Sequence, residues 1–132
     1  MTSFLLQSDI EEIVANMSIG SLSEFGGKHI LLTGGRGFLG RYFTAVFQHL
    51  NHKLLKDNPV RLTVMDNLIS AGPEGAQIPT IDHITFLQHD CIKPLPDIGK
   101  VDFILHAAGI ASPAHYRKYP LETLEVATTG LK

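Results

Sequence analysis

Three glycines at a spacing of three residues, Gly34, Gly37 and Gly40, constrain the fold more than any other feature of this sequence. A short run compatible with a β-strand, residues 28–32, precedes them, and a run with helical periodicity follows. Strand, glycine turn and helix in that order predict a βαβ unit with parallel strands and a right-handed crossover. The first glycine permits a tight turn, the second lets a pyrophosphate approach the backbone, and the third allows close packing of helix on strand.

The rest of the chain continues the alternation of strands and connections. The run after the glycines predicts a helix with a wide apolar face turned to the core, made of Phe38, Leu39, Tyr42, Phe43, Val46, Phe47 and Leu50. Further strands are expected at 60–65, 83–88 and 101–106, a loop at 68–82, and a last helix from Pro120. The fold class is therefore α/β.

The first 27 residues form a separate unit in this interpretation. Residues 8–19 predict a short amphipathic helix, with Ser8 and Glu11 at capping-box spacing and Gly20 as its end. We expect this helix and a linker to occupy residues 1–27 and a dinucleotide-binding domain to occupy residues 28–132.

Composition excludes several classes of function. The 132 residues are 44% hydrophobic and carry a net charge of -2, so the chain can bury a core and lacks the basic excess of a nucleic-acid binder. The single cysteine forms no internal disulfide, and no Cys/His spacing indicates a metal site. There is no long apolar run and no signal peptide at the N-terminus, so we expect a cytoplasmic protein without a membrane partner.

Asp66 ends the second predicted strand, where a carboxylate can accept hydrogen bonds from both hydroxyls of an adenosine ribose. A 2′-phosphate would be repelled there, which favours NAD over NADP. Arg36, within the glycine turn, offers the opposite interpretation, because a cation there could meet a 2′-phosphate. Its other interpretations are a solvated side chain or a contact to the pyrophosphate, and we weigh Asp66 more heavily.

Two further segments end at the same edge of the predicted sheet. Asp90 follows the third strand and could accept from an adenine amino group, or be an ordinary turn residue. The small residues 107–109 follow the fourth strand, as needed where a cofactor crosses the strand ends. Beyond them, Ser112 and His115 lie in an expected loop, which touches substrate in one interpretation and is plain surface in the other.

The motifs at 33–40, 66–67, 90 and 106–108 resemble the extended short-chain dehydrogenase/reductase family, the NAD-dependent epimerases and dehydratases of nucleotide sugars. Within it, residues 111–123 are most similar to the UDP-glucuronate decarboxylases. The resemblance implies a Rossmann-like parallel sheet with flanking helices, a nucleotide-sugar substrate and a homodimer. It implies NAD as cofactor, bound by Gly34, Gly37, Phe38, Leu39, Gly40, Asp66, Asn67, Asp90, Cys91, Ala107 and Ala108.

The resemblance also implies a chemistry that this chain does not carry by itself. In that family a Tyr-x-x-x-Lys pair removes a sugar hydroxyl proton while hydride passes to NAD, giving a 4-keto sugar. No Tyr-x-x-x-Lys occurs in these 132 residues, and Ala127 stands where the family usually has Asn. We therefore assign no catalytic residue here and expect the chain alone to be inactive.

The fourth predicted strand would be an exposed apolar edge, so we expect the chain to be the cofactor-binding part of a longer enzyme, with the sheet ending after about four strands. Two alternatives stay open. One is a non-catalytic dinucleotide-binding module or a degenerate family member. The other is a scaffold that assembles through its N-terminal helix.

Overall fold

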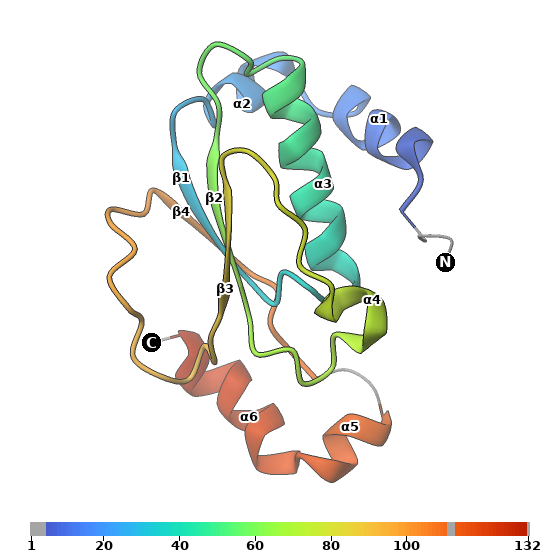
Figure 1. The fold of residues 1–132 in the computed structure, drawn as a ribbon, viewed down its shortest axis with the longest axis vertical. Helices are drawn as coiled ribbons and strands as arrows, with labels where there is room; N and C mark the ends of the chain where they lie inside the picture. Colours follow the sequence, from blue (N-terminus) through green and yellow to red (C-terminus); the bar gives the residue numbers. More distant parts are fainter. Residues whose placement is uncertain (1–4, 111–112, 132) are drawn as a thin grey trace.

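Helices and parallel strands alternate along the chain in a computed structural model that describes residues 5–110 and 113–131 (Figure 1). The strands are β1 (His29–Thr33), β2 (Arg61–Asp66), β3 (Ile84–Gln88) and β4 (Phe103–His106). The helices are α1 (Gln7–Ala15), α2 (Ile19–Ser23), α3 (Phe38–His52), α4 (Gly72–Ala76), α5 (Pro113–Lys118) and α6 (Pro120–Thr128), followed by the 3-10 turn η1 (Thr129–Leu131).

The strands form one parallel sheet in the order β3-β2-β1-β4. In register, Leu32 of β1 lies between Val64 of β2 and Leu105 of β4. The predicted α/β class and Rossmann-like parallel sheet are confirmed, and each expected strand is present within one or two residues of its predicted bounds. Helices α4, α5 and α6 lie at the end of the sheet where the strands terminate (Figure 1).

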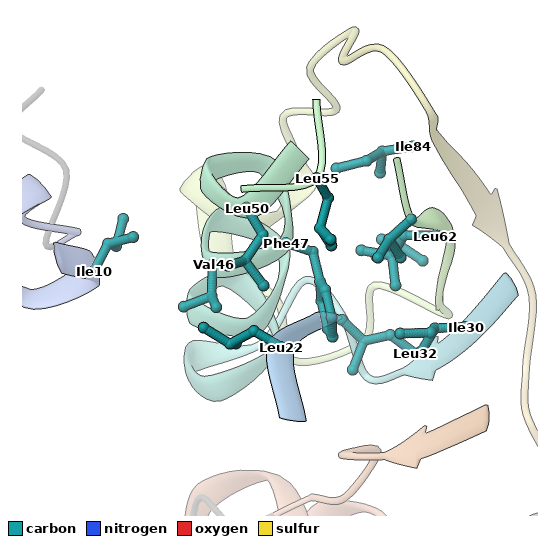
Figure 2. Close-up of a cluster of buried hydrophobic side chains, with 12 residues drawn as sticks. Ile10, Leu22, Ile30, Leu32, Val46, Phe47, Leu50, Leu55, Leu62 and Ile84 are labelled. Atoms are coloured by element: carbon teal, nitrogen blue, oxygen red, sulfur yellow. The ribbon is translucent and has the colours of Figure 1, made fainter. Parts of the chain in front are cut away.

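The core lies between α3 and one face of the sheet (Figure 2). Alternate residues of the strands, among them Ile30, Leu32 and Leu62, are fully buried there. They pack against Phe47 and Leu50 of α3. Complete burial of a side chain of this size stabilises the fold by about 1.5–3 kcal/mol, so this layer fixes α3, and the turn before it, on the sheet.

Only the second half of the predicted apolar face of α3 enters the core. Val46, Phe47 and Leu50 are buried, whereas Phe38 and Leu39 are 62% and 60% exposed. The prediction of one continuous core-facing face was therefore wrong for the first turn. Phe38 and Leu39 instead line an apolar groove that residues of α1 and α3 share.

The N-terminal helix is present, but its ends differ from the prediction. Helix α1 begins after Leu6 without a side-chain cap, so Ser8 lies inside the helix and the predicted capping box is wrong. Gly20 does not end it either, because the chain turns at Asn16 and starts α2, whose N-cap Ser18 accepts a hydrogen bond from the Ser21 N–H. Ile10 is buried in the core cluster, which places α1 on the outside of α3.

Contacts between α1 and α3 are also polar. The Tyr42 hydroxyl donates to the Asp9 carboxylate at 2.9 Å, and this hydrogen bond raises the pKa of Tyr42. Both residues are half-buried, and the hydrogen bond joins α1 to α3.

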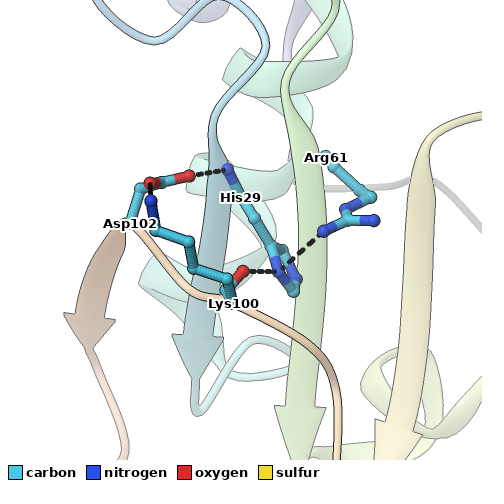
Figure 3. Close-up of polar contacts among 4 residues, drawn as sticks. All are labelled: His29, Arg61, Lys100 and Asp102. Carbon is cyan, nitrogen blue, oxygen red and sulfur yellow. Dashed lines mark hydrogen bonds and ion pairs between the residues drawn. The ribbon is translucent and has the colours of Figure 1, made fainter.

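A buried histidine joins the strands at the amino end of the sheet (Figure 3). His29 is 4% exposed, and its Nδ1 lies 2.7 Å from the Lys100 carbonyl oxygen, which can only accept. Nη2 of Arg61 lies 3.2 Å from the same Nδ1, and Nε2 lies 2.8 Å from the Thr63 hydroxyl oxygen. The backbone N–H of His29 donates to the Asp102 carboxylate at 2.9 Å. These bonds connect β1 to β2 and to the segment that leads into β4.

Strand β4 forms one edge of the sheet, as predicted. It pairs with β1 on one side, and its Phe103 and Ile104 are 42% and 65% exposed. Among the described residues, no helix is both long enough and apolar enough to cross a membrane.

Candidate functional site

A cavity of ≈ 60 Å³ opens at the carboxyl ends of the strands, next to the glycine turn. This is where parallel α/β sheets bind their ligands, because the loops after each strand converge there. Its lining residues come from the ends of all four strands, the adjoining loops and α6: Gly34, Gly37, Met65, Asp66, Asn67, Ser70, Ala71, His89, Cys91, Ala107, Ala108, Gly109, Ile110 and Val126.

The glycine turn is built as the sequence predicted. Gly34 has a φ of 67°, in the left-handed region, and a Cβ there would lie 2.5 Å from the carbonyl oxygen of Ala107. A Cβ on Gly40 would meet the Gly34 carbonyl oxygen at 2.3 Å, so α3 starts in direct contact with the turn. Gly37 is the N-cap of α3 and has no side chain to occupy the space above it. The cavity thus faces the first turn of α3, whose N–H groups and dipole attract an anion.

Asp66 lies at the end of β2 and lines the same cavity. Its Oδ2 accepts from the Arg36 N–H at 2.9 Å, and its Oδ1 accepts from the Leu68 N–H at 2.7 Å. These two bonds fix the carboxylate against the glycine turn. Since each carboxylate oxygen has a second lone pair, the group can still accept from ligand hydroxyls.

The guanidinium of Arg36 is buried rather than solvated. Arg36 is 7% exposed, and its Nε and Nη2 donate to the carbonyl oxygens of Gly75 and Gln77 at 2.7 and 2.6 Å. It also lies over the Phe86 ring, 5.5 Å from the centroid. Burial lowers the pKa of Arg36, Arg41 lowers it further, and Asp66 opposes both. The interpretation as a solvated side chain was wrong, and the guanidinium is engaged with protein backbone.

The segment after Asp66 is more ordered than the expected loop. It contains α4, and Ser70 and Ala71 ahead of α4 line the cavity. The Asn67 side chain also lines the cavity, and it caps its own turn by accepting from the Ile69 N–H at 3.1 Å. The segment therefore forms a wall of the cavity beside Asp66.

The segment after β3 contributes the neighbours of Asp90 rather than Asp90 itself. His89 and Cys91 line the cavity, and the Oδ1 of Asp90 accepts from the Ile92 N–H at 3.1 Å in a local turn. Burial, followed by the nearby carboxylates of Asp90 and Asp66, raises the pKa of the Cys91 thiol. Cys91 is thus placed as a neutral group in the wall.

The remaining predicted residues fall into two groups. Ala107 and Ala108 line the cavity, and the Ala107 N–H donates to the Thr33 carbonyl oxygen at 3.1 Å. Phe38 and Leu39 instead line an apolar groove between α1 and α3. Gly40 acts through its packing on the turn. The structure thus brings together Gly34, Gly37, Asp66, Asn67, Cys91, Ala107 and Ala108, and it leaves Phe38, Leu39, Gly40 and Asp90 outside the lining.

The predicted substrate residues are less well placed. Ser112 lies outside the described residues. His115 belongs to α5, so the expected loop is a helix at this point, and His115 does not line the cavity. Ala127 is exposed on α6, while its neighbour Val126 is buried and lines the cavity.

Sequence reasoning missed six lining residues: Met65, Ser70, Ala71, His89, Ile110 and Val126. Met65, His89 and Ile110 adjoin residues that were predicted, so allowing one neighbour at each strand end would have found them. Ser70, Ala71 and Val126 carry no comparable signal. In the described part of the chain, no cluster of three or more His, Cys, Asp or Glu side chains could hold a metal ion.

These features fit a dinucleotide. Gly34 and Gly37 leave space over the start of α3 for a pyrophosphate, and Asp66 presents acceptors for ribose hydroxyls on the same cavity. Ala107, Ala108 and Gly109, which follow β4, line the cavity with small residues.

Comparison with known proteins agrees with this geometry. Residues 30–131 match the family model described as the NAD dependent epimerase/dehydratase family. UDP-glucuronic acid decarboxylase 1 of Danio rerio is 38% identical over 111 residues, which cover 83% of this chain and 24% of that protein. UDP-glucuronic acid decarboxylase 3 of Arabidopsis thaliana is 33% identical over 103 residues, covering 76% of this chain and 27% of the relative. The chain spans about a quarter of the length of these relatives.

Two solved structures share the fold. The epimerase Mth375 of Methanothermobacter thermautotrophicus superimposes with a TM-score of 0.62 at 22% identity, over 86% of this chain and 32% of that one. A UDP-N-acetylglucosamine 4-epimerase of Methanobrevibacter ruminantium, solved with UDP-N-acetylmuramic acid, gives 0.54 at 24% identity, over 80% and 32%. With a family model that matches most of its length and relatives above 30% identity, this chain belongs to the NAD dependent epimerase/dehydratase family.

Proposed function

We propose that this chain is the NAD-binding portion of a nucleotide-sugar epimerase, dehydratase or decarboxylase that acts through a 4-keto sugar intermediate. The observation that carries the proposal is the convergence of the Gly34–Gly37 turn and the Asp66 carboxylate on one cavity. A pyrophosphate site and a ribose acceptor at the carboxyl ends of parallel strands are the two elements that dinucleotide recognition requires. The dinucleotide-binding unit is residues 28–132.

The cofactor that this geometry favours is NAD rather than NADP. Asp66 would face the 2′-oxygen of the adenosine ribose, where a phosphate meets like charge. The guanidinium of Arg36 is held by the carbonyl oxygens of Gly75 and Gln77, away from a role as a 2′-phosphate ligand. Bound NAD would supply a hydride acceptor and donor for oxidation and re-reduction of the sugar.

The residues of this chain would bind and orient in that reaction. The start of α3 would hold the pyrophosphate and Asp66 the adenosine ribose, and residues 107–110 form the part of the lining that follows β4. The substrate class proposed is a nucleotide sugar, with UDP-glucuronate as first candidate because relatives named UDP-glucuronic acid decarboxylase match 76–83% of the chain. A homodimer in the cytoplasm is proposed for the whole enzyme.

Calorimetric titration of the chain with NAD and with NADP tests the cofactor. The expected result is saturable binding of NAD, with NADP at least about tenfold weaker because of the charge on Asp66. Equal affinity for the two would contradict the role of Asp66, and no binding of either would contradict the proposed function. The protein isolated from its native source is then assayed for NAD-dependent release of carbon dioxide from UDP-glucuronate.

Dinucleotide binding without turnover is the second candidate for this chain. It is favoured by the residues four positions after Tyr42, Tyr116 and Tyr119, none of which is Lys. NAD binding with no conversion of any nucleotide sugar by the native-source protein would support this candidate over the first.

A further inference from the structure

The side chain of Arg36 holds the backbone of a segment that lies about forty residues further along the chain. Its Nε and Nη2 donate to the carbonyl oxygens of Gly75 and Gln77, at 2.7 and 2.6 Å. The guanidinium lies over the Phe86 ring of β3, and the whole residue is 7% exposed. A guanidinium presents its donors in a rigid plane, so it can hold two carbonyl groups at once in a fixed geometry.

The held segment packs directly on the glycine turn. A Cβ on Gly75 would lie 2.5 Å from the backbone oxygen of Arg36 and 2.7 Å from the Cβ of Ala71, so only glycine allows this approach. Ala71 is 8% exposed, and with Ser70 it lines the cavity. The segment fixed by Arg36 is thus continuous with the wall of the cavity.

The backbone of Arg36 acts on the same side of the cavity. Its N–H donates to Oδ2 of Asp66 at 2.9 Å and fixes the carboxylate that faces the ribose. One residue therefore orients the ribose acceptor through its main chain and holds the adjacent wall through its side chain.

We propose that Arg36 is a positioning residue for the dinucleotide, which holds residues 70–77 against the glycine turn so that the wall beside Asp66 is formed before the ligand binds. The proposal rests on the proposed function, because the ligand expected at this wall is the dinucleotide proposed there. Ordering a segment at the moment of binding costs affinity, whereas a segment held in place beforehand does not. Loss of the guanidinium should therefore weaken binding of the adenosine half of the ligand. The residues that contact the ligand directly would be unchanged.

Two measurements on the full chain test the proposal. Hydrogen exchange of residues 70–77, followed by mass spectrometry without ligand, reports how firmly the segment is held. Calorimetry with NAD and with ADP-ribose reports the affinity. In Arg36→Met we expect faster exchange of the segment and about tenfold weaker binding of both ligands, because both share the adenosine half. Arg36→Lys keeps the charge but loses the planar pair of donors. It should therefore show smaller changes in exchange and affinity than Arg36→Met without restoring the values of the unaltered chain.

Two further variants make the test sharper. Gly75→Ala displaces the segment without altering Arg36, and it should also speed exchange and weaken both ligands, which keeps the proposal testable if Arg36→Met does not fold. Arg61→Met is the matched control, since Arg61 is an exposed arginine at the amino end of β2 and should leave both readouts unchanged.

Faster exchange with unchanged affinity would overturn the proposal, and so would unchanged exchange in Arg36→Met. A loss confined to NAD and absent for ADP-ribose would also overturn it, because the wall would then not serve the adenosine half. Failure of the unaltered chain to bind either ligand overturns the proposed function instead. The two failures are distinguishable, because exchange without ligand reports on Arg36 whether or not a dinucleotide binds.

Discussion

The side-chain amide of Asn51 pairs with both backbone polar groups of Val60. Its Nδ2 donates to the Val60 carbonyl oxygen at 2.9 Å, and its Oδ1 accepts from the Val60 N–H at 2.8 Å. Asn51 lies in the last turn of α3, and Val60, which is fully buried, immediately precedes β2. The amide thus pairs with Val60 as the backbone of a neighbouring strand would. It fixes the end of α3 against the start of β2.

Replacing Asn51 with Leu should destabilise the fold by about 2–4 kcal/mol, because the volume is kept while a buried N–H and a buried carbonyl lose their partner. Urea denaturation measures the change in the free energy of unfolding. The neighbouring His52 is exposed, so His52→Leu serves as the control and should change it by less than about 0.5 kcal/mol. Equal effects of the two substitutions would show that the Asn51–Val60 pairing does not contribute.

Three glycine-to-alanine substitutions separate backbone strain from steric contact. Gly34 has a positive φ and a Cβ clash with Ala107, Gly72 has a positive φ and open space, and Gly20 has neither. We expect Gly34→Ala to destabilise most, Gly72→Ala by about 1–2 kcal/mol, and Gly20→Ala to stabilise α2 by about 0.5–1 kcal/mol.

Thermal denaturation of the three glycine variants gives the order of their stabilities. If Gly34→Ala were no worse than Gly72→Ala, the contact between the glycine turn and the end of β4 would be looser than its geometry indicates. Gly34→Ala should in addition abolish NAD binding, since the turn cannot move without displacing the start of α3.

The strands were predictable because their signal is local. Ile30, Leu31 and Leu32 are all buried, as a continuous apolar run next to a glycine turn indicates for a parallel strand covered on both faces. The glycine turn and Asp66 were predictable for a related reason, since residue type and position after a strand determine what each can do.

The short helices were not predictable in the same way. Helix α4 begins with Gly72 and Pro73, which indicate a loop, and it is held by the side chain of Arg36 from another part of the chain. Helix α5 begins with Pro113, a residue that is favourable in the first turn although it disrupts a helix interior. The interactions of the Arg36 side chain with the protein backbone were not among the interpretations drawn from the sequence, since a buried arginine is rare and its partners are backbone groups that no pattern marks.

Acidification should weaken the amino end of the sheet through Asp102. The hydrogen bond from the His29 N–H, aided by Lys100 and Lys28, holds the pKa of Asp102 below its ordinary value of 3.8. A carboxylate with a lowered pKa in the folded state stabilises that state above the unfolded pKa, and the contribution is lost as pH falls through the folded pKa. We expect the free energy of unfolding to fall less steeply below about pH 4 in Asp102→Asn than in the unaltered chain.

Urea denaturation at about pH 6 and about pH 3 measures this difference, and the comparison between variants cancels the other carboxylates. Asp97→Asn is the matched control, because Asp97 lies in the exposed segment before β4 and its side chain caps only its own turn. The same pH dependence in the unaltered chain and in Asp102→Asn would contradict the role of the His29–Asp102 bond.

Substitution of Asp66 tests ribose recognition separately from folding. Asp66→Ala removes the acceptor for the N–H groups of Arg36 and Leu68 as well as for the ligand, so it should weaken NAD by about 1–3 kcal/mol and also lower the free energy of unfolding. Asp66→Asn keeps one oxygen acceptor and loses the charge. Its affinity for NAD should therefore lie between that of the unaltered chain and that of Asp66→Ala. It should also lose most of its discrimination against NADP, because the repulsion of the 2′-phosphate is gone. Calorimetry on variants shown to be folded by circular dichroism measures both affinities, and unchanged discrimination in Asp66→Asn would show that another group selects the cofactor.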